Sequence, residues 1–402
     1  MTIPTKEYAT RRKKLLNSLK GAAGLVFAGQ RDEHAESFFR PHPHFEYLTG
    51  ITNEPNAILL LDPTQVTQSK QEVMFLTPRN PEKEQWDGIR SPLGSELREK
   101  TGFKTIHRTT LLEMVLLDIV SRSKSFATLM PPASTSSKVS EDLAMWQRIA
   151  ERTPECNIQD MSQLIPIMRS VKSPSEIAII QEAVDITAQG FANAMVFVQP
   201  DVNEFKVQAT LEHGYAMAGG RGSAFPPIVG GGLNSTVLHY GDNDQDLVDG
   251  ELVCIDSGAF FNGYGADISR TVPVSGKFSK RQKEIYEIVL KAEEAAISAV
   301  KPGVTIAQLD VIARAIIVKA GFGDYFIHGI GHHLGLETHD TCGPAIPLKI
   351  GAVITIEPGI YIPEESIGIR IEDDILVTAK GCLNVSKSIP KTVVEIEKAM
   401  RG

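Results

Sequence analysis

Residues 251–274 read ELVCIDSGAFFNGYGADISRTVPV, and this stretch decides the fold. Two apolar runs flank Asn262-Gly263, the residue pair most typical of a two-residue hairpin turn, because both turn positions need a positive φ. The pattern therefore predicts a β-hairpin in which residues 252–261 pair with residues 264–273.

The predicted register brings two aspartates together. It places Asp256 opposite Ser269 and Asp267 opposite Gly258, so the two carboxylates lie on one face as diagonal neighbours, about 7–8 Å apart. Isolated aspartates are mostly exposed, and a pair of surface residues is the simple alternative. The apolar Cys254-Ile255 before Asp256 instead indicates a buried strand end. Buried carboxylates need a counter-charge, and two of them can hold a shared cation.

Residues 351–378, GAVITIEPGIYIPEESIGIRIEDDILVT, repeat this pattern in the second half of the chain. An apolar run again leads into an acid, Glu357, and the returning run brings a second acid, Glu372. Two similar segments of this length indicate a tandem duplication folded about a pseudo-twofold axis. Each half would deliver one carboxylate pair to the junction between the halves.

The composition limits the class of protein. A chain of 402 residues exceeds a single core, so we expect two domains. The net charge of −8 is spread along the chain and gives no basic patch for nucleic acid. The four scattered cysteines form no C-x-x-C motif and indicate reduced thiols in a cytoplasmic protein. We find no export signal and no membrane-spanning apolar run.

Residues 1–165 read as a small α/β domain, because short apolar runs alternate with segments of helix length. A basic amphipathic helix is predicted over residues 5–20. We interpret His42 and His44 as loop histidines. The apolar runs lie at residues 25–27, 57–61, 72–76 and 126–130.

Residues 166–402 read as the second domain, of α+β character. Ser173 and Glu176 form a predicted capping box with proline at the first helical position, and Ser279 with Gln282 repeats the box in the other half. In each half a long helix, a shorter helix and acid-bearing strands follow one another. This repeated order agrees with the duplication of the hairpin.

Histidines add the remaining donors. Residues 328–339 hold four of the ten histidines of the chain, interleaved with glycines that allow close approach of a ligand. His239 precedes His339 by nearly the repeat length, so we expect the two to face each other. Four carboxylates and one imidazole form an oxygen-rich ligand set that suits Mn²⁺ and similar ions. Four negative charges would balance two divalent cations, and a two-metal site favours hydrolysis.

The motifs resemble those of a known family. Ile255-Asp256-Ser257-Gly258, Asp267-Ile-Ser-Arg-Thr, His328-Gly-Ile-Gly-His332-His-Leu-Gly, Glu357-Pro-Gly and Gly368-Ile-Arg-Ile-Glu372 resemble the pita-bread metallopeptidases aminopeptidase P and prolidase. The resemblance is strong from about residue 165 to the end. It reaches the first domain through residues 45–50 and 86–90. It implies a small N-terminal α/β domain followed by a pita-bread catalytic domain with an internal pseudo-twofold repeat.

The resemblance also implies roles for individual residues. It implies a binuclear centre in which Asp267 and Glu372 bridge two metal ions, most simply Mn²⁺, although Co²⁺ and Zn²⁺ accept the same ligands. Glu357 would also act as general base. Arg370 would hold the acid network, or alternatively would only form an ion pair with Glu372 or Asp373. The implied ligands are Asp256, Asp267, His332, Glu357 and Glu372, and the implied substrate-side histidines are His239, His328 and His339.

Two positions depart from the family pattern. Phe225 stands where relatives commonly carry a tyrosine, which removes a hydroxyl from the neighbourhood of the metal acids. His333 occupies a position that we associate with an aromatic or other bulky residue in the family. Both changes bear on the occupancy of the second metal and on the shape of the pocket.

The predicted function is a cytoplasmic Xaa-Pro aminopeptidase, which removes the first residue of peptides with proline second. Prolidase, a creatinase-like hydrolase without metal and a catalytically inactive peptide-binding module are the alternatives. The family suggests a homo-oligomer, a dimer or a tetramer. Trp86 would then be a lid residue, or alternatively a buried core or interface tryptophan.

Overall fold

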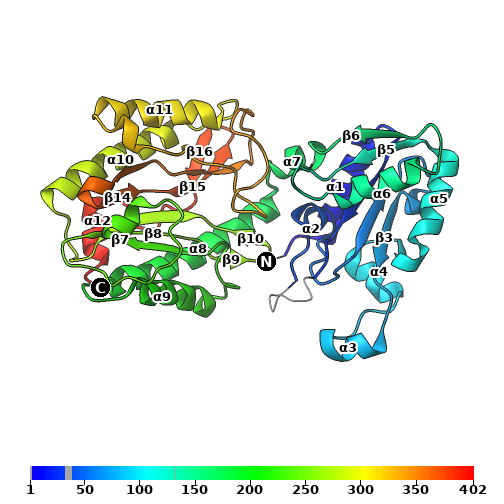
Figure 1. Ribbon diagram of the computed structural model, residues 1–402, viewed down its shortest axis with the longest axis horizontal. Helices are drawn as coiled ribbons and strands as arrows, with labels where there is room; N and C mark the ends of the chain where they lie inside the picture. The colour runs from blue at the N-terminus through cyan, green and yellow to red at the C-terminus, as the bar shows by residue number, and fades with distance from the viewer. Residues whose placement is uncertain (1, 32–38, 132) are drawn as a thin grey trace. The chain divides into compact units, whose positions relative to one another are not determined.

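The chain forms two compact units in the computed structural model, which describes residues 2–31, 39–131 and 133–402 (Figure 1). The smaller unit comprises Ile3–Met168, and the larger consists mainly of Arg169–Gly402.

The smaller unit is built on a six-stranded mixed sheet of order β4-β3-β2-β1-β5-β6. β1 runs antiparallel to β2 and parallel to β5, while Trp146 of α6 stacks on Phe126 of β5 at 4.4 Å between ring centroids. The predicted α/β class is confirmed. The strands are β1 (Ala23–Phe27), β2 (Ile58–Leu61), β3 (Glu72–Leu76), β4 (Thr105–Arg108), β5 (Ser125–Thr128) and β6 (Asn157–Asp160), and the helices are α1 (Thr5–Ser18), α2 (Pro43–Thr49), α3 (Pro81–Asp87), α4 (Ser95–Thr101), α5 (Leu112–Arg122), α6 (Glu141–Ala150) and α7 (Leu164–Arg169).

The interpretation of His42 and His44 as loop residues is wrong. His42 is the N-cap of α2 and its side chain accepts a hydrogen bond from the main-chain N–H of His44 at 3.1 Å. His44 lies inside the helix and is buried. Pro43 at the first helical position carried the signal for this helix start.

In the larger unit, strands lie between two pairs of helices, α8 with α9 and α10 with α11 (Figure 1). The capping boxes predicted at Ser173 and Ser279 are both present and begin α8 and α10. The helices are α8 (Pro174–Phe197), α9 (Glu204–Met217), α10 (Lys280–Ala299), α11 (Ile306–Lys319) and α12 (Val393–Ala399). The strands are β7 (Ile228–Gly231), β8 (Leu252–Ser257), β9 (Phe260–Phe261), β10 (Tyr264–Gly265), β11 (Ile268–Pro273), β12 (Val353–Ile356), β13 (Gly359–Ile362), β14 (Ile367–Arg370), β15 (Asp373–Thr378) and β16 (Gly381–Asn384).

The first hairpin has the predicted register. β8 and β11 are antiparallel and Asp256 pairs with Ser269. Asn262 and Gly263 both have positive φ, as their turn requires. At Gly258 a Cβ atom would lie 1.7 Å from the carbonyl oxygen of Ala266, so the sequence needs glycine for the two strands to approach here.

The second hairpin repeats the first with a different offset of its acids. β12 pairs with β15 through Ile356 and Asp373, and β13 pairs with β14 through Gly359 and Arg370. Both registers place Glu357 level with Glu372, whereas the acids of the first hairpin are diagonal neighbours. The two repeats therefore have the same order of strands, but the position of one carboxylate relative to the other differs between the two hairpins.

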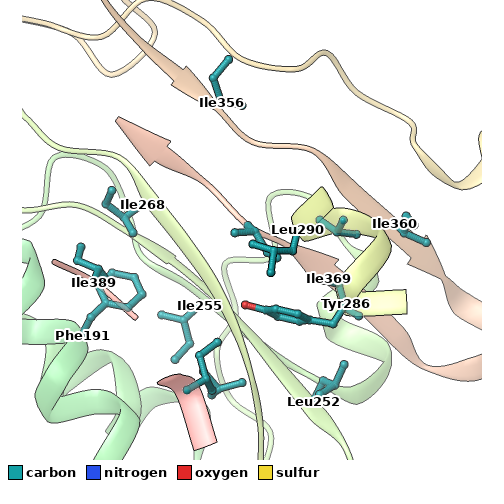
Figure 2. Close-up of a cluster of buried hydrophobic side chains, with 14 of the residues drawn as sticks. Phe191, Leu252, Ile255, Ile268, Tyr286, Leu290, Ile356, Ile360, Ile369 and Ile389 are labelled. Atoms are coloured by element: carbon teal, nitrogen blue, oxygen red, sulfur yellow. The ribbon is translucent and has the colours of Figure 1, made fainter. Parts of the chain in front are cut away.

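The two halves share one hydrophobic core. Phe191 of α8 and Ile255 of β8 belong to the same buried cluster as Tyr286 of α10 and Ile369 of β14 (Figure 2). Because both repeats contribute to this core, burial of apolar surface holds the acid-bearing strands of the two halves against each other. No helix among the described residues is long and apolar enough to span a membrane.

Candidate metal centre

The acids of both hairpins converge with one histidine. Asp267, His332 and Glu372 each offer a donor atom, and these atoms lie within 4.8 Å of one another. Asp267 and Glu372 come directly before β11 and β15, and His332 lies in the loop after α11. The side chains of Asp267 and Glu372 are buried.

Glu357 and Asp256 complete the set of predicted ligands. His332 Nε2 lies 3.4 Å from Asp267 Oδ2 and 3.4 Å from Glu357 Oε1, so one imidazole nitrogen faces two carboxylates. Asp256 Oδ1 is buried and has no hydrogen-bond partner among the described residues. A buried carboxylate oxygen without a partner is costly, and a cation beside it would satisfy it. The donor set therefore fits a hard divalent metal ion.

The pKa values of the acids reflect this crowding. Burial raises the pKa of Asp267 to about 6 and that of Glu357 to about 7, and neighbouring carboxylates add to both shifts. Burial and the charge of Asp267 also raise the pKa of Glu372 well above its usual range. Burial lowers the pKa of His332, but the adjacent carboxylates outweigh it and raise the value to about 9. The raised pKa values mean that these groups bind a proton more readily than usual, so additional positive charge is favoured at the site.

Arg370 supplies one fixed positive charge to the cluster. Its Nη2 donates to Asp256 Oδ2 at 2.7 Å, its Nε to Ser269 Oγ at 2.7 Å and its Nη1 to the Tyr361 hydroxyl at 2.9 Å. Ser269 Oγ in turn donates to Glu372 Oε2 at 2.7 Å. The alternative interpretation, an ion pair of Arg370 with Glu372 or Asp373, is wrong in its partners, because the guanidinium pairs with Asp256 across the two repeats.

The three predicted substrate-side histidines lie at different distances from the acids. His339 packs edge-on against His332, with ring centroids 4.2 Å apart. His328 Nδ1 lies 3.9 Å from Glu357 Oε2. His239 is exposed, and its charge lowers the pKa of His339 after the larger effects of burial and His332, which places it in the same neighbourhood.

The protonation of His328 follows from its partners. Burial, with the charge of Arg370, lowers the pKa of His328 to about 4, so the ring is neutral at pH 7. Its Nδ1 faces the Gly329 carbonyl at 2.8 Å, which can only accept, so the proton is on Nδ1. Nε2 then accepts from the Tyr361 hydroxyl at 2.8 Å. Tyr361 thus connects His328 to Arg370.

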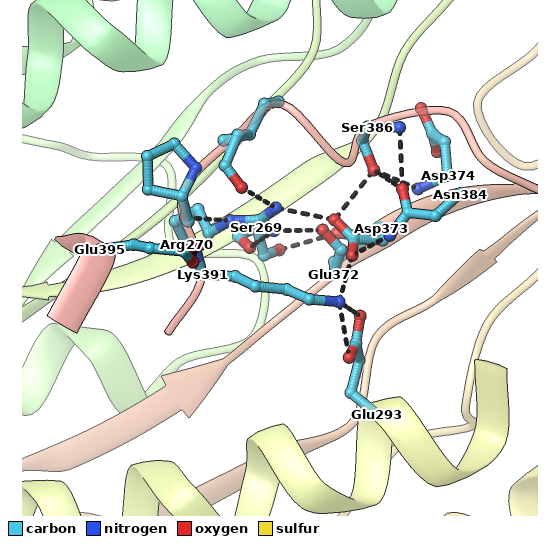
Figure 3. A network of polar contacts seen from close by, with 12 residues as sticks. Ser269, Arg270, Glu293, Glu372, Asp373, Asp374, Asn384, Ser386, Lys391 and Glu395 are labelled. Carbon is cyan, nitrogen blue, oxygen red and sulfur yellow. Dashed lines mark hydrogen bonds and ion pairs between the residues drawn. The ribbon is translucent and has the colours of Figure 1, made fainter. Parts of the chain in front are cut away.

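A second polar network lies behind Glu372 and was not predicted (Figure 3). Arg270 donates to the main-chain oxygens of Ser269 and Glu372 and, through Nη2, to Asp373 Oδ1 at 2.7 Å. Lys391 Nζ reaches Asp373 Oδ2 at 2.6 Å and Glu293 Oε1 at 2.8 Å. The signal was present in the sequence, because Arg270 is a charged residue within an apolar strand and needs a buried partner.

Comparisons with known proteins agree with this geometry. Residues 178–379 match the model of metallopeptidase family M24, and residues 8–128 match that of the aminopeptidase P N-terminal domain. A Xaa-Pro aminopeptidase of Haemophilus influenzae is 34% identical, over 99% of this chain and 98% of the relative. The chain belongs to the aminopeptidase P family. It is a metallo-aminopeptidase, as predicted, and the family implies divalent metal ions.

Two further relatives bear on the alternatives. The structure of aminopeptidase P from E. coli with the inhibitor Pro-Leu superposes with a TM-score of 0.88 at 31% identity, covering 100% of this chain and 99% of that one. A Xaa-Pro dipeptidase of Pyrococcus furiosus is 40% identical, but only over 61% of this chain and 71% of the relative. The predicted fold, a pita-bread domain after an aminopeptidase P N-terminal domain, is confirmed.

The residues that depart from the aminopeptidase P pattern have defined surroundings. Phe225 is half-buried and follows Ala224, whose N–H donates to Gly258 in the first hairpin at 2.8 Å. His333 is buried next to His332, a predicted ligand, and its Nδ1 has no hydrogen-bond partner among the described residues. Trp86 of α3 is 90% exposed, so a place in the core of its own unit is excluded.

Proposed function

We propose that this chain hydrolyses the Xaa-Pro bond at the N-terminus of peptides, using two divalent metal ions. The observation that carries the proposal is the convergence of Asp267, His332 and Glu372, whose donor atoms lie within 4.8 Å. The proposed ligands are Asp256, Asp267, His332, Glu357 and Glu372. Within this set Asp267 and Glu372 would be the carboxylates shared by the ions, as the resemblance to the family implies, since both contribute to the three-residue cluster.

The protein side chains would then divide the chemistry. When bound, the two ions supply Lewis acidity for cleavage of an amide bond. Glu357 is proposed as the general base, because it is a carboxylate of the cluster whose Oε1 lies 3.4 Å from His332 Nε2 and whose other oxygen lies near His328 on the proposed substrate side. Thr355 Oγ1 lies 3.2 Å from Glu357 Oε1 and accepts from the N–H of His332 at 3.1 Å. Thr355 therefore holds the proposed base beside the proposed ligand.

The substrate would lie on the side of the three histidines. His239 and His339 are proposed to orient the scissile carbonyl or to stabilise the tetrahedral oxyanion by hydrogen bonds. His328 would act there as a neutral ring, held by Tyr361 and the Gly329 carbonyl. Arg370 is proposed to fix the acid network, since its three donors reach Asp256, Ser269 and Tyr361.

The metal, the assembly and the compartment belong to the same proposal. Four carboxylates and one imidazole favour Mn²⁺, with Co²⁺ and Zn²⁺ as alternatives. We propose a homo-oligomer, a dimer or a tetramer, in which the exposed Trp86 covers the site of another subunit. Four free cysteines support a reducing, cytoplasmic location. Residues 1–165 would serve as the accessory domain and residues 166–402 as the catalytic domain.

The test removes the metal with a chelator, restores Mn²⁺ and measures release of the first residue from an Xaa-Pro-Yaa tripeptide and an Xaa-Pro dipeptide. Metal-dependent cleavage of the tripeptide is expected. Cleavage of the dipeptide alone would instead identify a prolidase, the reading that the similarity to the P. furiosus dipeptidase favours. Tight peptide binding without cleavage would identify an inactive binding module. Turnover at a normal rate by Glu357→Ala would contradict the proposed base.

A further inference from the structure

We propose that Glu204, the first residue of α9, is a positioning residue that fixes the loop carrying His239. The inference rests on the proposed function, in which His239 contacts the substrate. Glu204 itself does not reach the metal ligands by any contact in the described structure. It acts on the loop through hydrogen bonds to four donors.

The Glu204 carboxylate collects these donors from both ends of residues 231–245. Oε1 accepts from the main-chain N–H of Gly231 at 2.7 Å and from Asn234 Nδ2 at 3.2 Å. Oε2 accepts from the Tyr240 hydroxyl at 2.9 Å and from the main-chain N–H of Gln245 at 3.1 Å. The side chain is fully buried, so these four bonds replace its hydration.

His239 is followed by two buried anchors of this loop, Tyr240 and Asn243. Tyr240, its neighbour, is buried and bound to Glu204, whereas the His239 ring is exposed. Asn243 is also buried, and its side chain accepts from the N–H of Val229 at 3.0 Å and donates to the Pro227 carbonyl at 2.8 Å. The direction of the His239 side chain is therefore set by a main chain that is held on its C-terminal side.

The local sequence is built around the Glu204 carboxylate. A Cβ atom at Gly231 would lie 2.7 Å from Leu247 and 3.4 Å from Glu204 Oε1, and one at Gly230 would lie 2.7 Å from the Asn234 carbonyl oxygen. Glycine at position 230 thus lets the main chain turn back closely on Asn234, whose side chain donates to Glu204. A glutamate exposed at the start of a helix would not need glycine in a neighbouring loop.

The effect on catalysis follows from the chemistry of the site. An exposed imidazole can orient a carbonyl only if its main chain is fixed, because a displacement of about 1 Å can cost up to 100-fold in rate. In Glu204→Gln an amide NH₂ group replaces one carboxylate oxygen. This group cannot accept a hydrogen bond, so at least one of the four hydrogen bonds is lost. We expect kcat/KM for an Xaa-Pro-Yaa tripeptide to fall about tenfold.

The test is a double-mutant cycle in the Mn²⁺-loaded enzyme with Glu204→Gln, His239→Ala and the double variant. If Glu204 acts through His239, Glu204→Gln lowers kcat/KM in the parent and changes it less than twofold in the His239→Ala background. Full additivity of the two losses would overturn the inference. If His239→Ala left kcat/KM unchanged, the proposed role of His239 itself would be overturned. The two failures are therefore distinguishable.

Two controls separate positioning from stability. Asp142→Asn removes charge from a carboxylate that is also fully buried and accepts from the main-chain N–H groups of Leu129 and Met130, but lies in the other unit. It should lower the melting temperature with kcat/KM unchanged. If Glu204→Gln fails to fold, Tyr240→Phe removes one donor only and should show the same coupling to His239. If the losses of kcat/KM caused by Tyr240→Phe and His239→Ala were additive, the inference would be overturned as well.

Discussion

The guanidinium of Arg370 donates from Nη2 to Asp256 Oδ2 over 2.7 Å, joining the second hairpin to the first. Both side chains are largely buried. The bond engages Oδ2, and among the described residues Asp256 Oδ1 has no hydrogen-bond partner. Arg370 therefore sets the orientation of a proposed ligand from a position outside the ligand set.

Arg370→Lys is expected to lower metal affinity and kcat/KM by about 10- to 100-fold, the usual cost of losing a residue that orients a ligand. Lysine keeps the charge but cannot reach Asp256, Ser269 and Tyr361 in three directions at once, as the planar guanidinium does. Calorimetric titration of the chelated enzyme with Mn²⁺ and steady-state kinetics measure both effects. Arg281→Lys, on the surface beside Glu365, is the control and should change neither. Wild-type metal affinity in Arg370→Lys would contradict the prediction.

Tyr361→Phe should lower kcat/KM about tenfold and stability by about 1–2 kcal/mol, because the Arg370 Nη1 donor and the His328 Nε2 acceptor both lose their partner. The proton stays on His328 Nδ1, which still faces the Gly329 carbonyl, but Nε2 loses its hydrogen bond, and nitrogen NMR of the imidazole detects that loss as a shift of the Nε2 resonance. Tyr47→Phe removes a buried hydroxyl that donates to the Met168 carbonyl in the smaller unit. This control should lower stability only. An unchanged His328 Nε2 resonance in Tyr361→Phe would argue against the connection.

Sequence reasoning succeeded where the information was local. Asn262-Gly263 determines the turn and hence the register that pairs Asp256 with Ser269, because the turn residues alone need positive φ. Sequence reasoning failed to predict the partner of Arg370, because residues in different repeats come into contact only after the whole unit folds. His44 was misread although Pro43 signalled a helix start. The roles of the site residues remain predictions, since local sequence cannot give distances between side chains of separate hairpins.

Mn²⁺ at 100 times its dissociation constant should stabilise the enzyme by about 2.7 kcal/mol relative to the chelated form. The physical reason is that burial, together with the charges of neighbouring carboxylates, raises the pKa values of Asp267 and Glu357, and a bound cation relieves both costs. Scanning calorimetry with and without Mn²⁺ measures the shift in melting temperature. In His332→Ala the shift should shrink to near zero. An equal shift in that variant would place the metal elsewhere.

The buried cluster of Asp340 with Arg169 and Lys172 should make stability depend on pH in the acid range. Burial would raise the pKa of Asp340, but the charges of Lys172 and Arg169 outweigh it and lower the value below its ordinary 3.8. A lowered folded pKa gives stability that is present above the ordinary value and is lost as the pH falls through the folded pKa. The stabilisation should therefore persist at pH 5–7 and disappear below about pH 4.

Asp340→Asn tests this sign. At pH 7 the variant should be less stable by about 3–5 kcal/mol, because the buried Lys172 loses the carboxylate that it pairs with and Arg169 keeps only Glu337. The difference from wild type should narrow as the pH falls below about 4, in denaturant titrations of chelated protein. Asp185→Asn, at an exposed site on α8, is the control and should show no such trend. A stability difference that stays constant down to pH 3 would contradict the assignment.

Gly331→Ala should abolish metal binding, whereas Gly329→Ala should be tolerated. A Cβ atom at Gly331 would lie 2.1 Å from the Thr355 carbonyl oxygen, but one at Gly329 would meet nothing within 4 Å. The main chains on either side of Gly331 are joined, because the N–H of Glu357 donates to the Ile330 carbonyl at 2.8 Å and that of Thr355 to the His332 carbonyl at 2.9 Å. A methyl group at Gly331 would force these segments apart.

That separation would move His332 away from Glu357, which it faces at 3.4 Å. Overpacking of this kind costs about 1–3 kcal/mol, so Gly331→Ala should still fold and can be examined. Mn²⁺ titration and tripeptide cleavage of the two alanine variants, made side by side, measure the effect. The matched pair isolates the cause, since both variants add the same methyl group to the same loop two residues apart. Equal metal affinities in the two variants would show that the close approach of Gly331 to Thr355 does not position His332.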